Sequence, residues 1–279
     1  MSRFKKGLSQ ICFLRGTPLS KIFSVAQASG FDGVELRLSE KGEFSLESGD
    51  SDIDNIKKMA KEHGLEICSI VGGLQWKYPL TSPDPTIRER GISAAKKAVE
   101  FAAKLEAGAV LIVPAVVTSE VSYDKAWALA VDALLEIAKV AEKLDVLLAV
   151  ENVWNKFIFT PFEMNRFVDE INSKLTKKIV GVYFDVGNVV LFGYPEQWVR
   201  ILKERIKRIH IKDFKIGDGP AHFTFPFSGS VDWKAVMEAV VEVGYTGYLT
   251  AEIPIPALAM GSTAKYISML IDDILKLAS

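Results

Sequence analysis

The sequence predicts an α/β fold, a single (β/α)8 TIM barrel over residues 1–279, on three observations. Strand-like and helix-like segments alternate eight times along the chain, which is the pattern of parallel βαβ units. The 279 residues fit a barrel of this kind, which commonly uses about 250 residues as one domain. The longest irregular stretches all follow strands, where a barrel carries the loops of its substrate-binding face.

The predicted strands are short apolar runs rich in β-branched residues, as expected of parallel strands that are buried on both faces. They lie at residues 7–12, 33–38, 65–71, 108–113, 146–151, 179–185, 206–212 and 248–253. The predicted helices follow them at residues 18–29, 52–63, 86–106, 122–143, 161–173, 196–205, 232–243 and 262–277.

Local signals mark several helix ends. Gly30 and Gly64 follow helical stretches, and a glycine there can take the left-handed conformation that ends a helix. We expect Asp52 and Asp232 to begin helices, because a carboxylate can accept hydrogen bonds from the unpaired amides of a first turn. Pro161 suits the first turn of a helix, where its missing amide hydrogen costs nothing.

The composition excludes some classes of function. Nearly half of the residues are hydrophobic, which allows a large core, and the net charge of −1 gives no attraction to nucleic acid or to a membrane surface. No apolar run is long enough to cross a bilayer, so we expect a cytoplasmic protein. Cys12 and Cys68 lie in separate predicted strands without metal-binding spacing, and we interpret both as buried thiols.

Four ionisable residues lie at the ends of the last four predicted strands: Glu151, Asp185, His210 and Glu252. All strand carboxyl ends of a barrel open on one face, so these side chains are expected to converge there. Any one of them alone would more often be a capped or salt-bridged strand end. Four in succession predict a site for a divalent ion such as Mn²⁺, Mg²⁺ or Co²⁺, because such ions prefer oxygen-rich ligands with little sulfur.

Several segments resemble those of a known family: GVELRL (33–38), the stretch SPDPTIRERGISAAKKAVEFAAKLEAGAVLI (82–112), AVENVW (149–154), YFDVGN (183–188), RIHIKD (208–213), GSVDW (229–233) and TAEI (250–253). Together they resemble the xylose-isomerase-like TIM-barrel superfamily of sugar isomerases and epimerases. Within it the chain is most similar to ketose 3-epimerases related to D-tagatose 3-epimerase, and to epimerases of keto sugar acids such as 5-keto-L-gluconate.

The resemblance implies an isomerase, a metal-dependent carbohydrate epimerase that inverts a carbon next to the ketone of a ketose or keto sugar acid. It implies one divalent metal ion, usually manganese, held by Glu151, Asp185, His210 and Glu252. Glu151 and Glu252 would also form the acid/base pair that removes and returns a proton through an enediolate. Members of this group often form dimers or tetramers, so a homo-oligomer is expected.

Two positions depart from the family pattern. Relatives usually have a histidine where Asn188 stands; asparagine can bind a substrate hydroxyl but cannot carry a proton near neutral pH. The additional glutamate that relatives have shortly after the first metal ligand is missing, since Phe157 and Ile158 occupy that region. Lys156 lies there instead, and it is a candidate partner for a substrate carboxylate.

The predicted substrate-binding residues are Asn188, Lys156, Trp154 and His222. Trp154 offers a flat apolar surface to a sugar, and His222 is a candidate lid residue in a long loop. Lys212 and Asp213 either orient His210 and contact substrate or form a structural charged pair. For Glu35, a place in the pocket floor and a buried ion pair, for instance with Arg37, are equally open.

Three other functions compete with an epimerase. An aldose–ketose isomerase or an inosose-type sugar dehydratase would use the same metal and enediolate chemistry. A DNA-cleaving enzyme of the endonuclease IV branch would need three zinc ions and a basic face, whereas this chain has three histidines and a net charge of −1. A non-catalytic sugar-binding barrel would not need a costly cluster of acids. The expected partner is a small sugar or sugar acid, with no nucleic acid and no membrane.

Overall fold

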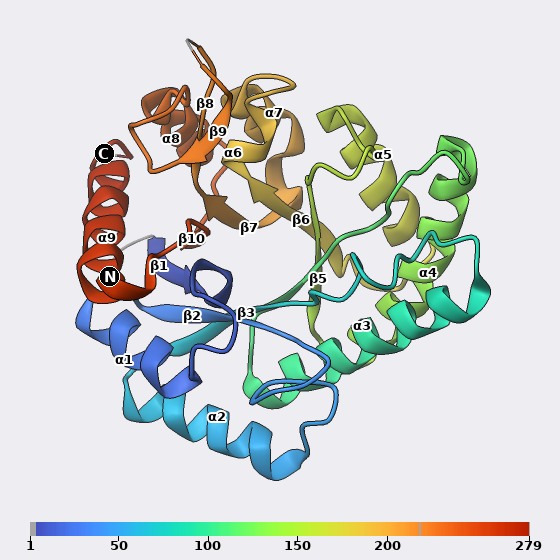
Figure 1. Ribbon diagram of the computed structural model, residues 1–279. Coiled ribbons are helices and arrows are strands. Elements are labelled where there is room, and N and C mark those ends of the chain that lie inside the picture. The colour runs from blue at the N-terminus through green and yellow to red at the C-terminus, as the bar shows by residue number, and fades with distance from the viewer. Residues whose placement is uncertain (1–3, 218, 279) are drawn as a thin grey trace.

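The structure is a computed structural model that describes residues 4–217 and 219–278, and it confirms the predicted single (β/α)8 barrel (Figure 1). The sheet is closed and all its strand pairs are parallel. In order around the barrel, the strands are β1 (Phe4–Ser9), β2 (Gly33–Arg37), β3 (Glu66–Val71), β4 (Ala109–Ile112), β5 (Leu147–Glu151), β6 (Val180–Asp185), β7 (Ile206–Ile211) and β10 (Gly247–Ala251).

Helices surround the barrel and cover the outer faces of its strands (Figure 1). The longer ones are α1 (Leu19–Ala28), α2 (Asp50–Glu62), α3 (Pro85–Leu105), α4 (Tyr123–Leu144), α5 (Pro161–Asn172), α7 (Pro195–Leu202), α8 (Trp233–Glu242) and α9 (Met260–Lys276). Short elements on the loops are η1 (Gln10–Cys12), α6 (Val186–Val189), η2 (Lys203–Arg205), the antiparallel pair β8 (Asp213–Lys215) and β9 (His222–Thr224), and η3 (Ala257–Ala259).

The prediction for the first strand is wrong in position. The strand begins at Phe4, and residues 10–12 turn into η1, where the Ser9 hydroxyl accepts a hydrogen bond from the Ile11 amide at 3.2 Å. A serine side chain that bonds to a nearby amide competes in this way with the sheet ladder. Cys12 therefore lies outside the strand, while Cys68 lies in β3, and both thiols are buried as predicted.

The predicted helix ends agree with the structure at four of five residues. Gly30 and Gly64 have positive φ angles directly after helices, Pro161 starts α5, and Asp232 accepts from the first turn of α8. Asp52 does not begin its helix. Gly49 holds the cap position of α2, and the Asp52 carboxylate instead accepts from the Gly49 amide at 2.8 Å, because a third-position acid can bond back to the cap.

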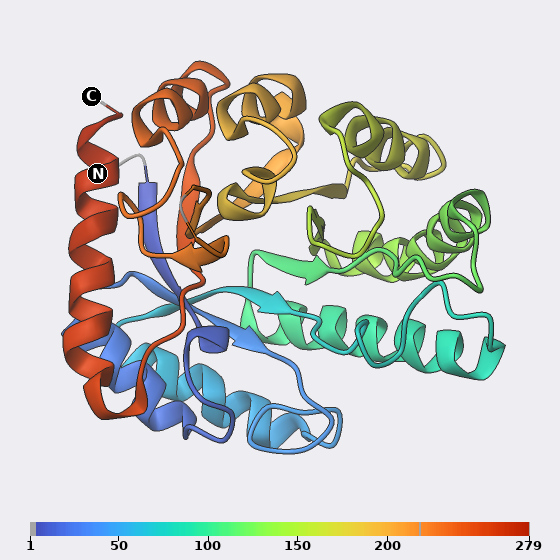
Figure 2. The same cartoon turned by 45° about the horizontal axis from the view of Figure 1, so that its top comes forward.

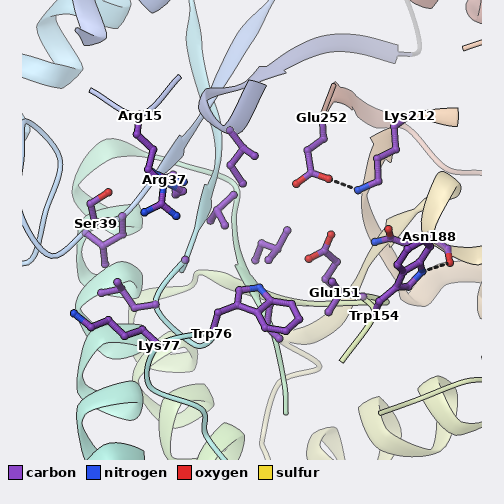
Figure 3. A pocket seen from close by; sticks show the side chains of 18 of the residues that line it. Arg15, Arg37, Ser39, Trp76, Lys77, Glu151, Trp154, Asn188, Lys212 and Glu252 are labelled. Atoms are coloured by element: carbon purple, nitrogen blue, oxygen red, sulfur yellow. Dashed lines mark hydrogen bonds and ion pairs between the residues drawn. The ribbon is translucent and has the colours of Figure 1, made fainter. Parts of the chain in front are cut away.

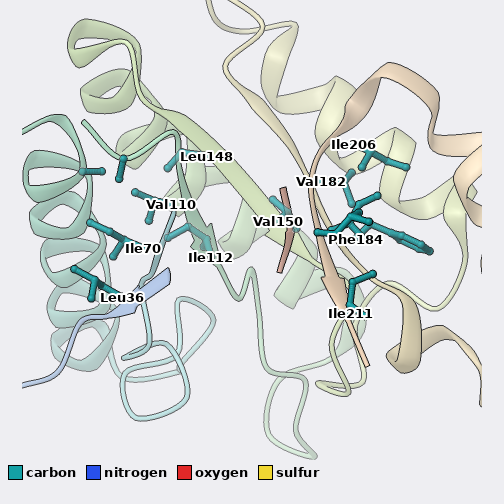
Figure 4. Packing of buried hydrophobic residues seen from close by; sticks show 14 of the residues in the cluster. Leu36, Ile70, Val110, Ile112, Leu148, Val150, Val182, Phe184, Ile206 and Ile211 are labelled. Atoms are coloured by element: carbon teal, nitrogen blue, oxygen red, sulfur yellow. The ribbon is translucent and has the colours of Figure 1, made fainter. Parts of the chain in front are cut away.

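The main hydrophobic core lies between the strands and the helices. Leu36, Val110, Val150, Phe184 and Ile211 point from β2, β4, β5, β6 and β7 toward the helical layer (Figure 4). Their neighbours along each strand point into the barrel, because successive side chains of a strand alternate between its faces. This alternation decides which residues can reach the barrel interior.

The barrel interior is partly apolar and partly polar. Ala109, Leu111, Ala149 and Tyr183 belong to a small separate cluster on the inner faces of β4, β5 and β6. Toward the carboxyl ends of the strands the interior becomes charged, and these ionisable side chains are described below. A charged interior at one end of a packed barrel is the usual position of a TIM-barrel active site.

The two ends of the described chain pack together. Helix α9 runs beside β1 in both views (Figures 1 and 2). The Lys6 ammonium group on β1 lies 2.7 Å from a carboxylate oxygen of Asp272 and 2.9 Å from the Ser268 hydroxyl, both on α9. In the described part of the chain, no helix is both long and apolar enough to cross a membrane.

Candidate metal centre and active site

Four ionisable side chains meet at the carboxyl ends of β5, β6, β7 and β10. Each of Glu151, Asp185, His210 and Glu252 offers one ligand atom within 4.8 Å of the atoms offered by the others. The His210 Nδ1 atom lies 3.5 Å from Glu151 Oε1 and 3.7 Å from both Asp185 Oδ2 and Glu252 Oε2. The four residues expected to converge therefore do so.

Glu35 on β2 orients His210 from across the barrel. Its Oε1 atom lies 3.0 Å from His210 Nε2, and both side chains are fully buried. Its Oε2 atom accepts from Tyr183 at 2.6 Å and from Ser69 at 2.7 Å. Burial alone would raise the pKa of Glu35, but the charge and hydrogen bond of His210 lower it below its usual value. The imidazole therefore donates through Nε2 and turns Nδ1 toward the carboxylates.

The residues present fit a divalent ion. His210 Nδ1 is buried and has no hydrogen-bond partner among the described residues, although three carboxylates surround it. Burial alone would lower the pKa of His210, yet the charges of Glu35 and Glu252 raise it well above its usual value. The raised pKa means that the imidazole favours holding a proton among these acids. A cation in the same place would replace that proton and relieve the repulsion between the carboxylates. Three oxygen donors and one imidazole suit Mn²⁺, Mg²⁺ or Co²⁺.

Lys212 supplies positive charge at the edge of the cluster. Its Nζ atom lies 2.8 Å from Asp185 Oδ2 and 2.5 Å from Glu252 Oε2. Burial alone would lower its pKa, but Asp185 and Glu252 raise the pKa above its usual value. Gly187 makes room for it, since a Cβ atom at that position would come within 2.7 Å of Lys212 Cγ. Lys212 thus belongs to the site.

Asp213, the neighbour of Lys212, has a structural role. Its carboxylate accepts hydrogen bonds from the Phe214 amide at 2.8 Å, the Val231 amide at 3.1 Å and the Trp233 indole at 3.0 Å. These bonds hold the loop that leads into α8. The sequence left two interpretations open for this charged pair. Lys212 contacts the site, whereas Asp213 has a structural role.

A cavity of about 570 Å³ opens above the cluster, at the mouth of the barrel. Glu151, Glu252, Lys212 and Asn188 line it, and Figure 3 shows the two glutamates facing the same space. Asp185 and His210 are fully buried behind them. The cavity volume is typical of sites for small molecules. Two of the four candidate ligands are therefore accessible to a substrate, and two are not.

The two accessible glutamates have opposite electrostatic surroundings. Burial raises the pKa of Glu151 to about 7. Burial also acts on Glu252, but the charges of Lys212 and His210 outweigh it and lower the pKa of Glu252 to about 2. A pair of carboxyl groups whose pKa values are pushed apart is suited to act as an acid and a base.

A hydrogen-bonded network fixes the loops after β5 and β6. The Asn152 side chain donates to the Asp185 carbonyl and accepts from the Asp185 amide, each at 2.8 Å. The Asn188 side chain donates to the Asn152 carbonyl at 2.9 Å, and the Trp154 indole donates to the Asn188 carbonyl at 2.9 Å. Asn188 and Trp154, two of the predicted substrate-binding residues, both line the cavity.

The other two predicted substrate-binding residues lie elsewhere. Lys156 lines an adjoining pocket of about 230 Å³ whose other lining residues are mostly apolar. His222 is exposed on β9, where its Nδ1 atom lies 2.9 Å from the Pro220 carbonyl oxygen. Neither belongs to the lining of the cavity above the cluster.

Sequence reasoning missed several cavity residues. Arg15, Arg37 and Phe223 line the cavity. Arg37 could have been found, because it ends β2 two residues after Glu35 and so shares the inner face of that strand. Phe223 lies on a three-residue strand, β9, whose sequence is too short to show a period.

Comparison with known proteins identifies the family and the relatives of the chain. A family model described as a xylose isomerase-like TIM barrel matches residues 23–269. Fructoselysine 3-epimerase of Shigella flexneri is 22% identical over 250 residues, which cover 87% of each chain. Inosose dehydratase of Lacticaseibacillus casei is 28% identical over 116 residues, which cover 36% of this chain and 39% of that protein.

The fold has close counterparts among solved structures. A D-tagatose 3-epimerase-like protein superposes with a TM-score of 0.79 at 20% identity, with 98% of each chain covered. Several relatives and structural neighbours that match most of the chain are named as epimerases, which confirms the predicted enzyme class, an isomerase of the carbohydrate epimerase type.

Proposed function

We propose that this chain, which belongs to the xylose isomerase-like TIM barrel family, is a metal-dependent epimerase that inverts a carbon next to the ketone of a ketose or keto sugar acid. The main support for the proposal is that the four clustered residues divide into an accessible pair and a buried pair. Glu151 and Glu252 face the cavity, whereas Asp185 and His210 are buried behind them. This division supports acid/base roles for the first two residues and purely ligating roles for the second two.

The two glutamates approach the substrate from different sides. Glu151 ends β5 and Glu252 follows β10, and β6 and β7 lie between these strands in the barrel. One glutamate removes the proton next to the ketone, and the other returns a proton to the opposite face, which inverts the carbon. Lys212, between Asp185 and Glu252, helps keep Glu252 ionised as a base.

Glu151, Asp185, His210 and Glu252 would hold the metal ion. When bound there, a divalent ion would supply Lewis-acid stabilisation of the negative charge that develops on the substrate oxygens. Asn188, whose side-chain amide bonds to Asn152, is placed to contact a substrate hydroxyl but not to carry a proton. Manganese as the ion, 5-keto-L-gluconate as a substrate, a cytoplasmic location and a homo-oligomeric state remain predictions.

Product analysis separates this function from its rivals. Purified protein with added Mn²⁺ would be incubated with ketohexoses, keto-hexonates and inososes, and the products identified by NMR. The proposal predicts epimers of one or more ketoses or keto acids. Aldoses as products would indicate an aldose–ketose isomerase, and loss of water from an inosose would indicate a dehydratase, the activity named for the partial relative from L. casei. Protein treated with a chelator is the control and should give no product.

A further inference from the structure

Two arginines form a positively charged wall of the cavity, away from the acidic cluster. Arg15 lies in the loop after η1, and Arg37 is the last residue of β2. Figure 3 shows both guanidinium groups, with Ser39 beside them, across the cavity from Glu252 and Lys212. The same two arginines line a smaller adjoining pocket of about 250 Å³. They thus line the side of the cavity opposite Glu252 and Lys212.

Neither guanidinium group has a carboxylate partner in residues 4–217 and 219–278. Besides Glu151 and Glu252, two glutamates line these pockets, and both are engaged elsewhere. Glu40 pairs with Lys77 and also accepts from the Tyr78 hydroxyl. Glu43 accepts from the Leu19 amide at the start of α1, at 2.7 Å. Glu40 and Glu43 therefore do not neutralise the two arginines.

Of the two arginines, Arg37 has the unfavourable surroundings, whereas Arg15 is exposed to solvent. Arg37 is about half-buried, and burial together with the charge of Arg15 lowers its pKa below the usual value. Partly buried charges are normally paired, and like charges near each other repel. Lys77, an exposed cation that also lines the cavity, is by contrast paired with Glu40. An anion bound between Arg15 and Arg37 would remove both penalties.

We propose that Arg15 and Arg37 bind an anionic end group, a carboxylate or a phosphate, of an open-chain keto sugar whose ketone end lies at Glu151 and Glu252. Guanidinium groups present paired N–H donors that match carboxylate and phosphate oxygens, and the Ser39 hydroxyl adds a donor beside them. The proposal rests on the proposed epimerase function. It assigns to these arginines the role that the sequence suggested for Lys156, which lines a different pocket.

Kinetics with matched substrates test this role. Arg37→Gln and Arg15→Gln would be compared with the natural protein on a ketohexose, a keto-hexonate and a ketohexose phosphate of the same chain length. On the anionic substrates alone, each variant should show a kcat/KM that is roughly 10- to 100-fold lower, mainly because KM rises. A loss of this size is expected when a charge-assisted hydrogen bond is removed. Lys77→Gln is the matched control and should change little. Equal losses on charged and neutral substrates, or no loss, would overturn the proposal.

A binding measurement keeps the test independent of turnover. Saturation-transfer NMR would compare D-gluconate, D-glucitol and glucitol 6-phosphate, which share a carbon chain and differ in the end group. The natural protein should bind gluconate or the phosphate more tightly than glucitol, and Arg37→Gln should abolish that preference. Preference for one anion identifies the end group. If glucitol binds as well as both anions, the arginine site is refuted; if the preference is present without turnover, only the epimerase function fails.

Discussion

At the scale of single residues, Glu35 shows how the inner face of the barrel prepares the metal centre. It lies on β2, far along the chain from His210, and yet it fixes the ring through the Nε2 atom at 3.0 Å. Its second oxygen is held by the hydroxyl groups of Tyr183 and Ser69. A carboxylate that bonds to the second nitrogen of a metal-binding histidine orients the imidazole and raises its basicity.

We therefore expect Glu35→Gln to weaken Mn²⁺ binding by roughly 10- to 100-fold, because an amide cannot support the imidazole as an anion does. Isothermal titration calorimetry with Mn²⁺ measures this affinity. Glu66→Gln is the control, since Glu66 contacts Lys5 and Tyr248 at the opposite end of the strands. Equal affinities for Glu35→Gln and the natural protein would show that Glu35 does not position His210.

The sequence was informative about residues at strand ends and uninformative about their partners. Glu151, Asp185, His210 and Glu252 could be predicted because each interrupts an apolar run at the point where a strand ends. The contact between His210 and Glu35 could not be predicted. It joins β2 and β7 through the barrel interior, and a contact between distant strands produces no pattern in the local sequence. The position of Arg15 at the cavity could not be predicted either, because its loop has no periodicity.

At the scale of elements, the β8–β9 pair is the main feature that the sequence did not predict. Each strand has three residues, too few to show an alternating pattern. The pair carries Phe223 to the cavity, where its ring lies 4.7 Å from the Lys212 ammonium group. Asp213, the first residue of β8, anchors this region through its three hydrogen bonds.

Asp213→Ala should destabilise the protein by roughly 2 to 4 kcal/mol, because it leaves buried amide and indole donors without a partner. Urea unfolding gives this free energy. Asp232→Ala is a matched comparison on the next helix, where an exposed carboxylate makes a single cap bond at 3.0 Å and the expected loss is about 1 kcal/mol. A smaller loss for Asp213→Ala than for Asp232→Ala would contradict the anchoring role.

At the scale of the whole molecule, the closed barrel buries both cysteines. Burial raises the pKa of Cys68 to about 12 and raises that of Cys12 further above its usual value. The folded state thus favours the neutral thiols. In the unfolded chain the thiols ionise near pH 9, so stability from this source is complete below that pH and decreases as the pH rises above it.

Iodoacetamide at pH 8 should therefore label neither cysteine in the native protein and both in concentrated urea, as read by mass spectrometry. Thermal unfolding between pH 8 and pH 10.5 should show a falling midpoint, and a Cys12→Ala, Cys68→Ala double variant should show a smaller fall. Rapid labelling of the native protein would contradict the burial of these thiols.

Glu151 and Glu252 are proposed to exchange a substrate proton across the cavity, and solvent hydrogen exchange is the sharpest test of that role. The protein with Mn²⁺ would be incubated in D₂O with each ketose or keto acid, and ¹H NMR would follow the carbon next to the ketone. We expect deuterium at one carbon together with the epimer, and a loss of roughly 10²- to 10⁴-fold in both rates for Glu252→Gln. Epimer formation without deuterium, or an unchanged rate in Glu252→Gln, would contradict it.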